Sequence, residues 1–210
     1  VPWHFHEADL PGIQSLDAFM GIYGFPPHID AAFRPAVQKQ FHFMARPDSL
    51  AYRDADIFDL GGVRVRVLHT PGHTRGHCCF LIDWDGSEDR ILYLGDIDLS
   101  SFGPYYGDAW SNLEDFERSL KRVREVEARW YATFHHIGVL DTREQYLERL
   151  DRFAGVIPDR EARLLAYLDE TRSLDEIAEH RFIYRPGDAV EFAEAVERRS
   201  MSMHLDRLVA

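Results

Sequence analysis

The chain has 210 residues, 45% of them hydrophobic, and a formal net charge of −12. A chain of this size can bury a sizeable core, so we expect a globular protein with one main domain and a small appendage. The acidic balance, without any segment dense in Lys and Arg, argues against a nucleic-acid partner, because such binding must neutralise many phosphates at once. No run of about 18 apolar residues occurs, so no membrane-spanning segment is expected.

The two cysteines, Cys78 and Cys79, are neighbours in the sequence. Adjacent side chains on a strand point to opposite faces, which makes them a poor disulfide pair. We interpret both as reduced core residues, which fits a cytoplasmic location. The chain opens at Val1, three residues before its first chemical motif. We therefore expect N-terminal strands to be missing, and what preceded Val1 is left open.

Hydrophobic patterns predict a mixed α/β architecture. Residues 13–49 are cut by several prolines and are predicted to form short, broken helices. Val63, Val65 and Val67 alternate with arginines, the period of a strand with one buried face. Short apolar runs predict further strands at 78–82, 91–94 and 131–134, and apolar residues at spacings of three and four predict helices at 112–126 and 142–153.

From Pro158 the composition shifts to helical segments rich in Arg and Glu. Ser173 and Glu176 have the spacing of a capping box, which predicts a helix start. We therefore divide the chain into a main domain of residues 1–157 and a small C-terminal helical domain of residues 158–210.

Four short segments carry the residues that bear chemistry, and each is predicted at the end of a strand or in the loop after it, where open α/β sheets hold their sites. They are His4-Phe5-His6-Glu7-Ala8-Asp9, His69-Thr70-Pro71-Gly72-His73-Thr74-Arg75-Gly76-His77, Leu94-Gly95-Asp96-Ile97-Asp98 and His135-His136-Ile137-Gly138.

Two histidines at i and i+2, such as His4 and His6, place both imidazoles on one side of an extended chain, as converging metal ligands require. Alone, that pair is more typical of an ordinary surface. Pro71-Gly72 forces a turn that directs His73 outward. Asp96 follows an apolar strand, where a carboxylate is costly unless it meets a cation or hydrogen-bond donors. A loop histidine or a capping aspartate explains each motif separately, but not all four together.

In this order the motifs resemble the metallo-β-lactamase superfamily, across residues 4–140. The most specific is Thr-Pro-Gly-His-Thr-x-Gly-His. The resemblance implies an αββα sandwich with the site at one sheet edge. It also implies that His4, His6 and His73 hold one metal and that Asp96 bridges toward a second.

The late ligand implied by the resemblance is His135, slightly preferred over His136. We interpret His77 and Asp98 as supporting side chains behind the ligands. The tail beyond residue 158 resembles the small winged-helix-like domain of some members, although a plain helical cap explains it equally well.

The first motif departs from the family pattern His-x-His-x-Asp-His, because Ala8 and Asp9 stand where the Asp and the His belong. Three interpretations stay open. In the first, Asp9 substitutes as a ligand and catalytic group, and the site keeps two metals. In the second, the site holds one metal. In the third, catalysis has been lost.

The resemblance implies a zinc-dependent hydrolase with one or two ions, and iron or manganese as the alternative cofactor. In it, a metal-bound water oriented by Asp96 attacks an ester, thioester or lactam-type carbonyl of a small-molecule substrate. The alternatives are a mononuclear iron oxygenase resembling persulfide dioxygenases and a non-catalytic binding protein that kept the fold. Substrate-binding residues are unknown at this stage, and assembly into a homo-oligomer is left open.

Overall fold

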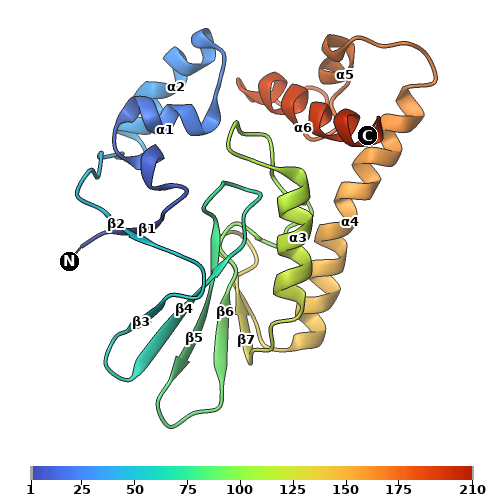
Figure 1. Cartoon of the computed structure of the whole chain (residues 1–210). Coiled ribbons are helices and arrows are strands. Elements are labelled where there is room, and N and C mark those ends of the chain that lie inside the picture. The colour runs from blue at the N-terminus through green and yellow to red at the C-terminus, as the bar shows by residue number, and fades with distance from the viewer. Residues whose placement is uncertain (1, 210) are drawn as a thin grey trace.

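The computed structural model describes residues 2–209, and its centre is a six-stranded sheet in the order β3-β4-β5-β6-β7-β8 (Figure 1). A separate parallel pair, β1-β2, lies beside it. The strands are β1 (His4–His6), β2 (Leu50–Tyr52), β3 (Ile57–Asp59), β4 (Val63–His69), β5 (Cys78–Trp84), β6 (Arg90–Tyr93), β7 (Trp130–Ala132) and β8 (Val139–Leu140). The helices are α1 (Leu16–Tyr23), α2 (Pro27–Lys39), α3 (Leu113–Arg124), α4 (Arg143–Tyr167), α5 (Leu174–His180) and α6 (Ala193–Leu208), with a short 3-10 turn at Leu10–Ile13.

The alternating pattern of residues 63–67 does form a strand. In the antiparallel pair β4-β5, Val65 lies opposite Ile82 and Val67 opposite Phe80. The predicted strands at 78–82 and 91–94 are β5 and β6, and the predicted helices before residue 49 are α1 and α2. Pro35 lies inside α2 and does not end it.

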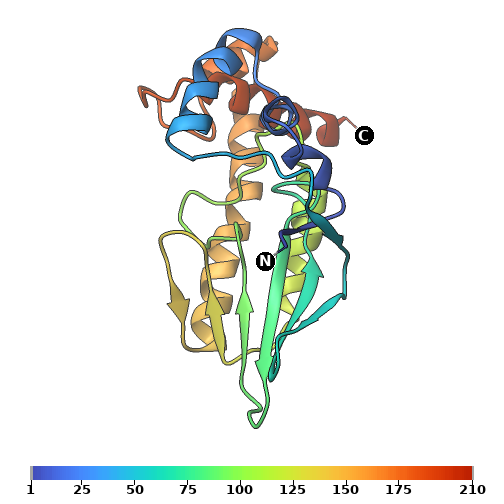
Figure 2. The ribbon, with the colours of Figure 1, turned by 90° about the vertical axis from the view of Figure 1, so that its left-hand side faces the viewer.

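One face of the sheet packs against α3 and α4, which lie together on that side (Figures 1 and 2). The amphipathic pattern of residues 112–126 is responsible, because it places one apolar stripe of α3 toward the sheet. Full burial of a large apolar side chain stabilises a fold by about 1.5–3 kcal/mol. The buried side chains of this core include Cys79, Leu92, Tyr131, Phe116, Leu120, Val123, Leu150, Phe153 and Ile157.

The predicted αββα sandwich is seen only in part. Within residues 2–209 there is one large sheet with helices on one face, and a second large sheet is not among these residues. The other face carries the alternate residues of the same strands, among them Phe80, Ile82 and Tyr93, which are half-buried. The mixed α/β part of the prediction is therefore confirmed.

The division of the chain into two domains at residue 158 stays a prediction. Helix α4 continues through Pro158, so the proposed boundary falls inside a helix. A separate small core of Leu164, Ile177, Phe182 and Met201 nevertheless packs beyond it. The capping box of Ser173 and Glu176 is present at the start of α5. The winged-helix character stays a prediction. In the part of the chain that the structure describes, no helix is both long enough and apolar enough to cross a bilayer.

Candidate functional site

Sheet topology brings three of the predicted ligands to one edge. Strand β5 is antiparallel to both β4 and β6, and β7 is parallel to β6, so β4, β6 and β7 all run in the same direction. His73, Asp96 and His135 each follow one of these strands. Their side chains therefore meet at the edge where the carboxyl ends of the three strands lie.

Asp96 lies between the two histidines. Its Oδ2 is 4.0 Å from Nε2 of His73, and its Oδ1 is 3.4 Å from Nε2 of His135. The three side chains line a cavity of about 310 Å³. The other lining residues are Asp98, Ser100, Phe102, Gly103, Tyr105 and His136.

The turn that presents His73 is tightly constrained. Gly72 has φ +136°, and a Cβ at this residue would lie 2.3 Å from the Cα of Phe116. A larger residue would therefore have to displace the backbone of α3. Ser111 donates from Oγ to the carbonyl of His73 at 2.7 Å, which fixes the turn from a second side.

The imidazole of His73 is oriented by a backbone carbonyl. Its Nδ1 lies 3.1 Å from the carbonyl oxygen of Tyr105. A carbonyl oxygen can only accept, so the proton is on Nδ1 and the lone pair of Nε2 faces Asp96. Metal-binding histidines are held in this way by a partner on the nitrogen that does not bind the metal.

His77 supports the backbone of Asp96 and is not free to bind a metal. Its Nδ1 lies 2.9 Å from the carbonyl oxygen of Thr70, and its Nε2 accepts the N–H of Asp96 at 3.0 Å. Both ring nitrogens are therefore occupied. Burial and the neighbouring His73 lower the pKa of His77 to about 4, so the ring is neutral at pH 7.

A buried carboxylate, Asp108, lies behind His73. The Tyr105 hydroxyl donates to it at 3.0 Å. Burial raises the pKa of Asp108 to about 6, although the nearby His73 acts in the opposite direction. Sequence analysis did not find this residue, because no local pattern connects Asp108 with the turn at His73.

The two histidines of the first predicted motif lie against other aromatic rings. His4 packs against Phe58, with ring centroids 5.1 Å apart, and His6 stacks on His69 at 3.9 Å. Neither lines the cavity around His73. Burial and the nearby His69 lower the pKa of His6. His4 and His6 belong to β1, which pairs with β2 in parallel, and their role as metal ligands stays a prediction.

Asp9 accepts hydrogen bonds from the turn that carries His73. Its Oδ2 accepts from the Thr74 hydroxyl at 2.5 Å, and its Oδ1 accepts from the N–H of Gly76 at 2.7 Å. Both oxygens therefore brace the turn that carries His73. The role of Asp9 as a substitute ligand and catalytic group stays a prediction.

The geometry favours His135 over His136 as the late histidine. Both histidines line the cavity. Of the two, His135 alone has a ring nitrogen within 4 Å of the Asp96 carboxylate in the described residues. Asp98 also lines the cavity, and its carboxylate accepts the backbone N–H of Ser100 at 3.0 Å.

The donor types of His73, Asp96 and His135 are those that zinc takes in proteins. Two ligands of one tetrahedral zinc lie roughly 3.3 Å apart, close to the 3.4 Å between Asp96 and His135. The distance from Oδ2 of Asp96 to Nε2 of His73 is longer, at 4.0 Å. Within residues 2–209, no group of three or more His, Cys, Asp or Glu side chains is arranged so that it could hold a metal ion. The ligand set therefore stays a prediction, and the chemistry of the donors is what supports it.

Comparison with known proteins gives the same family. No family model matches the chain. A segment of 72 residues is 35% identical to an atrochrysone carboxyl ACP thioesterase of Passalora fulva, covering 34% of this chain and 19% of that protein. Another segment, of 93 residues, is 29% identical to a hydroxyacylglutathione hydrolase of Maricaulis maris and covers 44% of this chain and 30% of that protein. The matches thus span about a fifth to a third of these relatives.

A solved structure resembles the whole chain. A metallo-beta-lactamase family protein from Thermus thermophilus aligns with a TM-score of 0.69 and 26% identity, covering 100% of this chain and 66% of that protein. This likeness and the distant relatives, which are named a thioesterase and a hydroxyacylglutathione hydrolase, together identify the class of protein. The chain belongs to the metallo-β-lactamase superfamily.

Proposed function

We propose that this chain contributes the site of a metal-dependent hydrolase that cleaves a thioester-type bond of a small substrate. The observation that carries the proposal is the cluster of His73, Asp96 and His135 at one sheet edge, with His73 oriented by the carbonyl of Tyr105. The thioester is suggested by the relatives, one named a thioesterase and the other a hydroxyacylglutathione hydrolase.

His73 and His135 would hold the ion through Nε2, and Asp96 would face it from between them. When bound, a zinc ion supplies Lewis-acid activation of a water molecule and of the scissile carbonyl. The carboxylate of Asp96 lies where it can orient the attacking water and take up its proton. Phe102 and Tyr105 line the same cavity and offer an apolar wall to the acyl group.

The test combines metal analysis with hydrolysis of acyl thioesters and esters by the wild type, His73→Ala and His42→Ala. His42 is an exposed histidine outside the cavity and serves as the matched control. We expect bound zinc and thioester hydrolysis in the wild type and the control, and loss of both in His73→Ala. A wild type without transition metal, or a His73→Ala variant that keeps full hydrolysis, would contradict the proposal.

One observation favours a second candidate, a mononuclear iron oxygenase. The cluster consists of two histidines and one carboxylate, the arrangement that binds iron in non-haem oxygenases. Iron rather than zinc in the purified protein, with oxygen uptake in the presence of a thiol-derived substrate, would support this alternative.

A further inference from the structure

A second cavity adjoins the candidate active site. It has a volume of about 410 Å³ and lies between α4 and the segment before α6. Phe102 lines this cavity as well as the one around His73 and Asp96, so the two cavities adjoin at this residue. A substrate long enough to pass Phe102 would reach the second cavity.

Three arginines line this second cavity, Arg160, Arg163 and Arg185. Among residues 2–209, none of them has a carboxylate within 4.0 Å, whereas ten other arginines do. The one acidic lining residue is Asp188, which accepts the backbone N–H of Arg185. In a chain of net charge −12, this cavity thus gathers three arginines against the one carboxylate of Asp188.

The three guanidinium groups differ in what they can offer a ligand. Arg160 is buried and donates to the carbonyls of Phe102 and Pro104, so it contributes charge but few free donors. Arg163 is exposed and donates to the carbonyl of Phe182 at 3.0 Å. The side chain of Arg185 makes no hydrogen bond within the described residues, so all its donors are available.

The segment that leads to Arg185 is held in place by a buried acid. Glu197, fully buried in α6, accepts the backbone N–H groups of Phe182, Ile183 and Tyr184 at 2.7–3.1 Å. The ring of Tyr184 in turn lies against that of Phe102, with centroids 5.7 Å apart. The wall of the second cavity is therefore tied both to α6 and to the residue that borders the active site.

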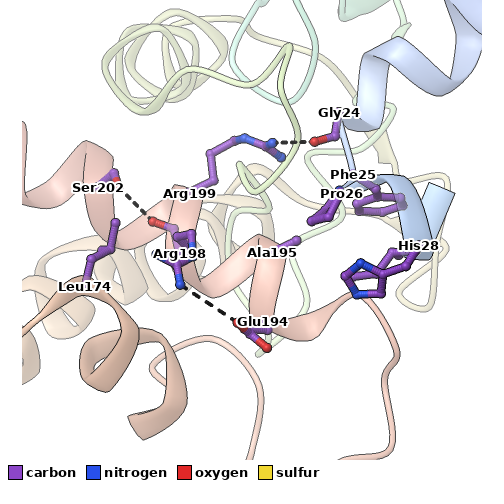
Figure 3. A pocket seen from close by; sticks show the side chains of 11 residues that line it. Gly24, Phe25, Pro26, His28, Leu174, Glu194, Ala195, Arg198, Arg199 and Ser202 are labelled. Atoms are coloured by element: carbon purple, nitrogen blue, oxygen red, sulfur yellow. Dashed lines mark hydrogen bonds and ion pairs between the residues drawn. The ribbon is translucent and has the colours of Figure 1, made fainter.

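Another cavity, of about 470 Å³, lies between the α1–α2 turn and α6 (Figure 3) and does not have this character. Its Arg198 is paired with Asp175 and Glu194. Its Arg199 donates to the carbonyls of Tyr23, Gly24 and Gly107. The positive charge at that cavity is therefore already engaged by protein groups.

We propose that the cavity of Arg160, Arg163 and Arg185 binds an oxyanion, a phosphate or carboxylate, on the thiol portion of the substrate. This assignment rests on the proposed thioesterase function for the identity of the substrate. The acyl portion of a thioester is commonly apolar, so the charged portion that suits unpaired guanidinium groups is the thiol carrier. Arginine is the side chain that recognises phosphate and carboxylate through paired hydrogen bonds.

The test measures binding and needs no turnover. Calorimetric titration compares 4′-phosphopantetheine with pantetheine, which has the same thiol and lacks the phosphate. Glutathione is a third probe, whose oxyanions are carboxylates. Each is titrated into the metal-loaded wild type, Arg185→Gln, Arg185→Lys and the control Arg90→Gln. Arg90 is an exposed arginine without an ion pair in the described residues, and it begins β6 at the end of that strand opposite Asp96.

We expect phosphopantetheine, glutathione or both to bind the wild type about tenfold more tightly than pantetheine, the effect of one charge-assisted contact. Arg185→Gln should abolish the difference, Arg185→Lys should keep part of it because lysine retains the charge without the paired hydrogen bonds, and Arg90→Gln should keep it in full. Which thiol binds tells whether the oxyanion is a phosphate or a carboxylate. Equal binding of all three thiols by the wild type, or an equal loss in Arg185→Gln and Arg90→Gln, would overturn the proposal. Arg185-dependent binding without thioester hydrolysis would leave the oxyanion site in place and refute only the thioesterase.

Discussion

Replacing Arg160 with methionine should loosen the segment that orients His73. The Arg160 side chain is 2% exposed and donates to the carbonyls of Pro104 at 2.6 Å and Phe102 at 2.7 Å. Hydrogen bonds to charged groups contribute about 1.5–3 kcal/mol each, and removing a buried charge recovers part of that loss. The free energy of unfolding should therefore fall by about 2–4 kcal/mol. The next residue after Pro104 is Tyr105, whose carbonyl holds Nδ1 of His73, so zinc affinity should fall about tenfold or more.

Urea denaturation and a competitive zinc titration measure the two effects, with Arg152→Met as the matched control. Arg152 lies on the same helix and forms an exposed pair with Glu148, which contributes about 1 kcal/mol or less. If Arg160→Met is as stable as Arg152→Met, the two carbonyl contacts do not support the segment. If stability falls and zinc affinity is unchanged, the Tyr105 carbonyl does not orient His73.

Three further predictions concern the same region. Gly72→Ala should destabilise the fold by about 2 kcal/mol or more, because the added Cβ would meet the backbone of Phe116. Gly155→Ala should stabilise the fold by about 0.5–1 kcal/mol, because Gly155 lies in α4 with open space around it. Thermal melts of the two variants measure both effects. The pKa of His77 is about 4 in the folded protein instead of the ordinary 6.5, so the unfolded chain takes up this proton at a higher pH than the folded one. The wild type should therefore lose stability relative to His77→Gln as the pH falls from 6.5 to 4. A constant difference across that range would contradict the burial of a neutral His77. For Asp108 the change of stability with pH has the opposite sign, because its pKa is raised from 3.8 to about 6. The metal-free wild type should gain stability relative to Asp108→Asn as the pH falls from 6 to 3.8, and urea titrations at each pH measure the difference.

Sequence reasoning succeeded where the signal was local. The turn at Pro71-Gly72 and the acid after an apolar strand predicted that His73 and Asp96 lie at strand ends, and the topology places them together. The valine alternation of β4 and the apolar stripe of α3 also predicted their elements, because both patterns depend on neighbours within one element.

Contacts between distant segments could not be predicted from local patterns. A His-x-His pair has the same pattern in a metal site and in an ordinary strand, and pairing of β1 with β2, more than 40 residues later, decides where His4 and His6 lie. The carboxylate of Asp9 braces a turn some 65 residues away. Arg160 and Asp108 carry no motif at all, because their roles depend on how α4 and the segment after Asp96 meet in space.

The central claim is that His73, Asp96 and His135 share one metal ion. The most direct test is an anomalous difference map at the zinc absorption edge from crystals of the zinc-loaded protein. The account predicts a peak beside the carboxylate of Asp96, within coordination distance of Nε2 of His73 and of His135. A peak at His4 and His6 instead, or none beside Asp96 in zinc-loaded crystals, would contradict it.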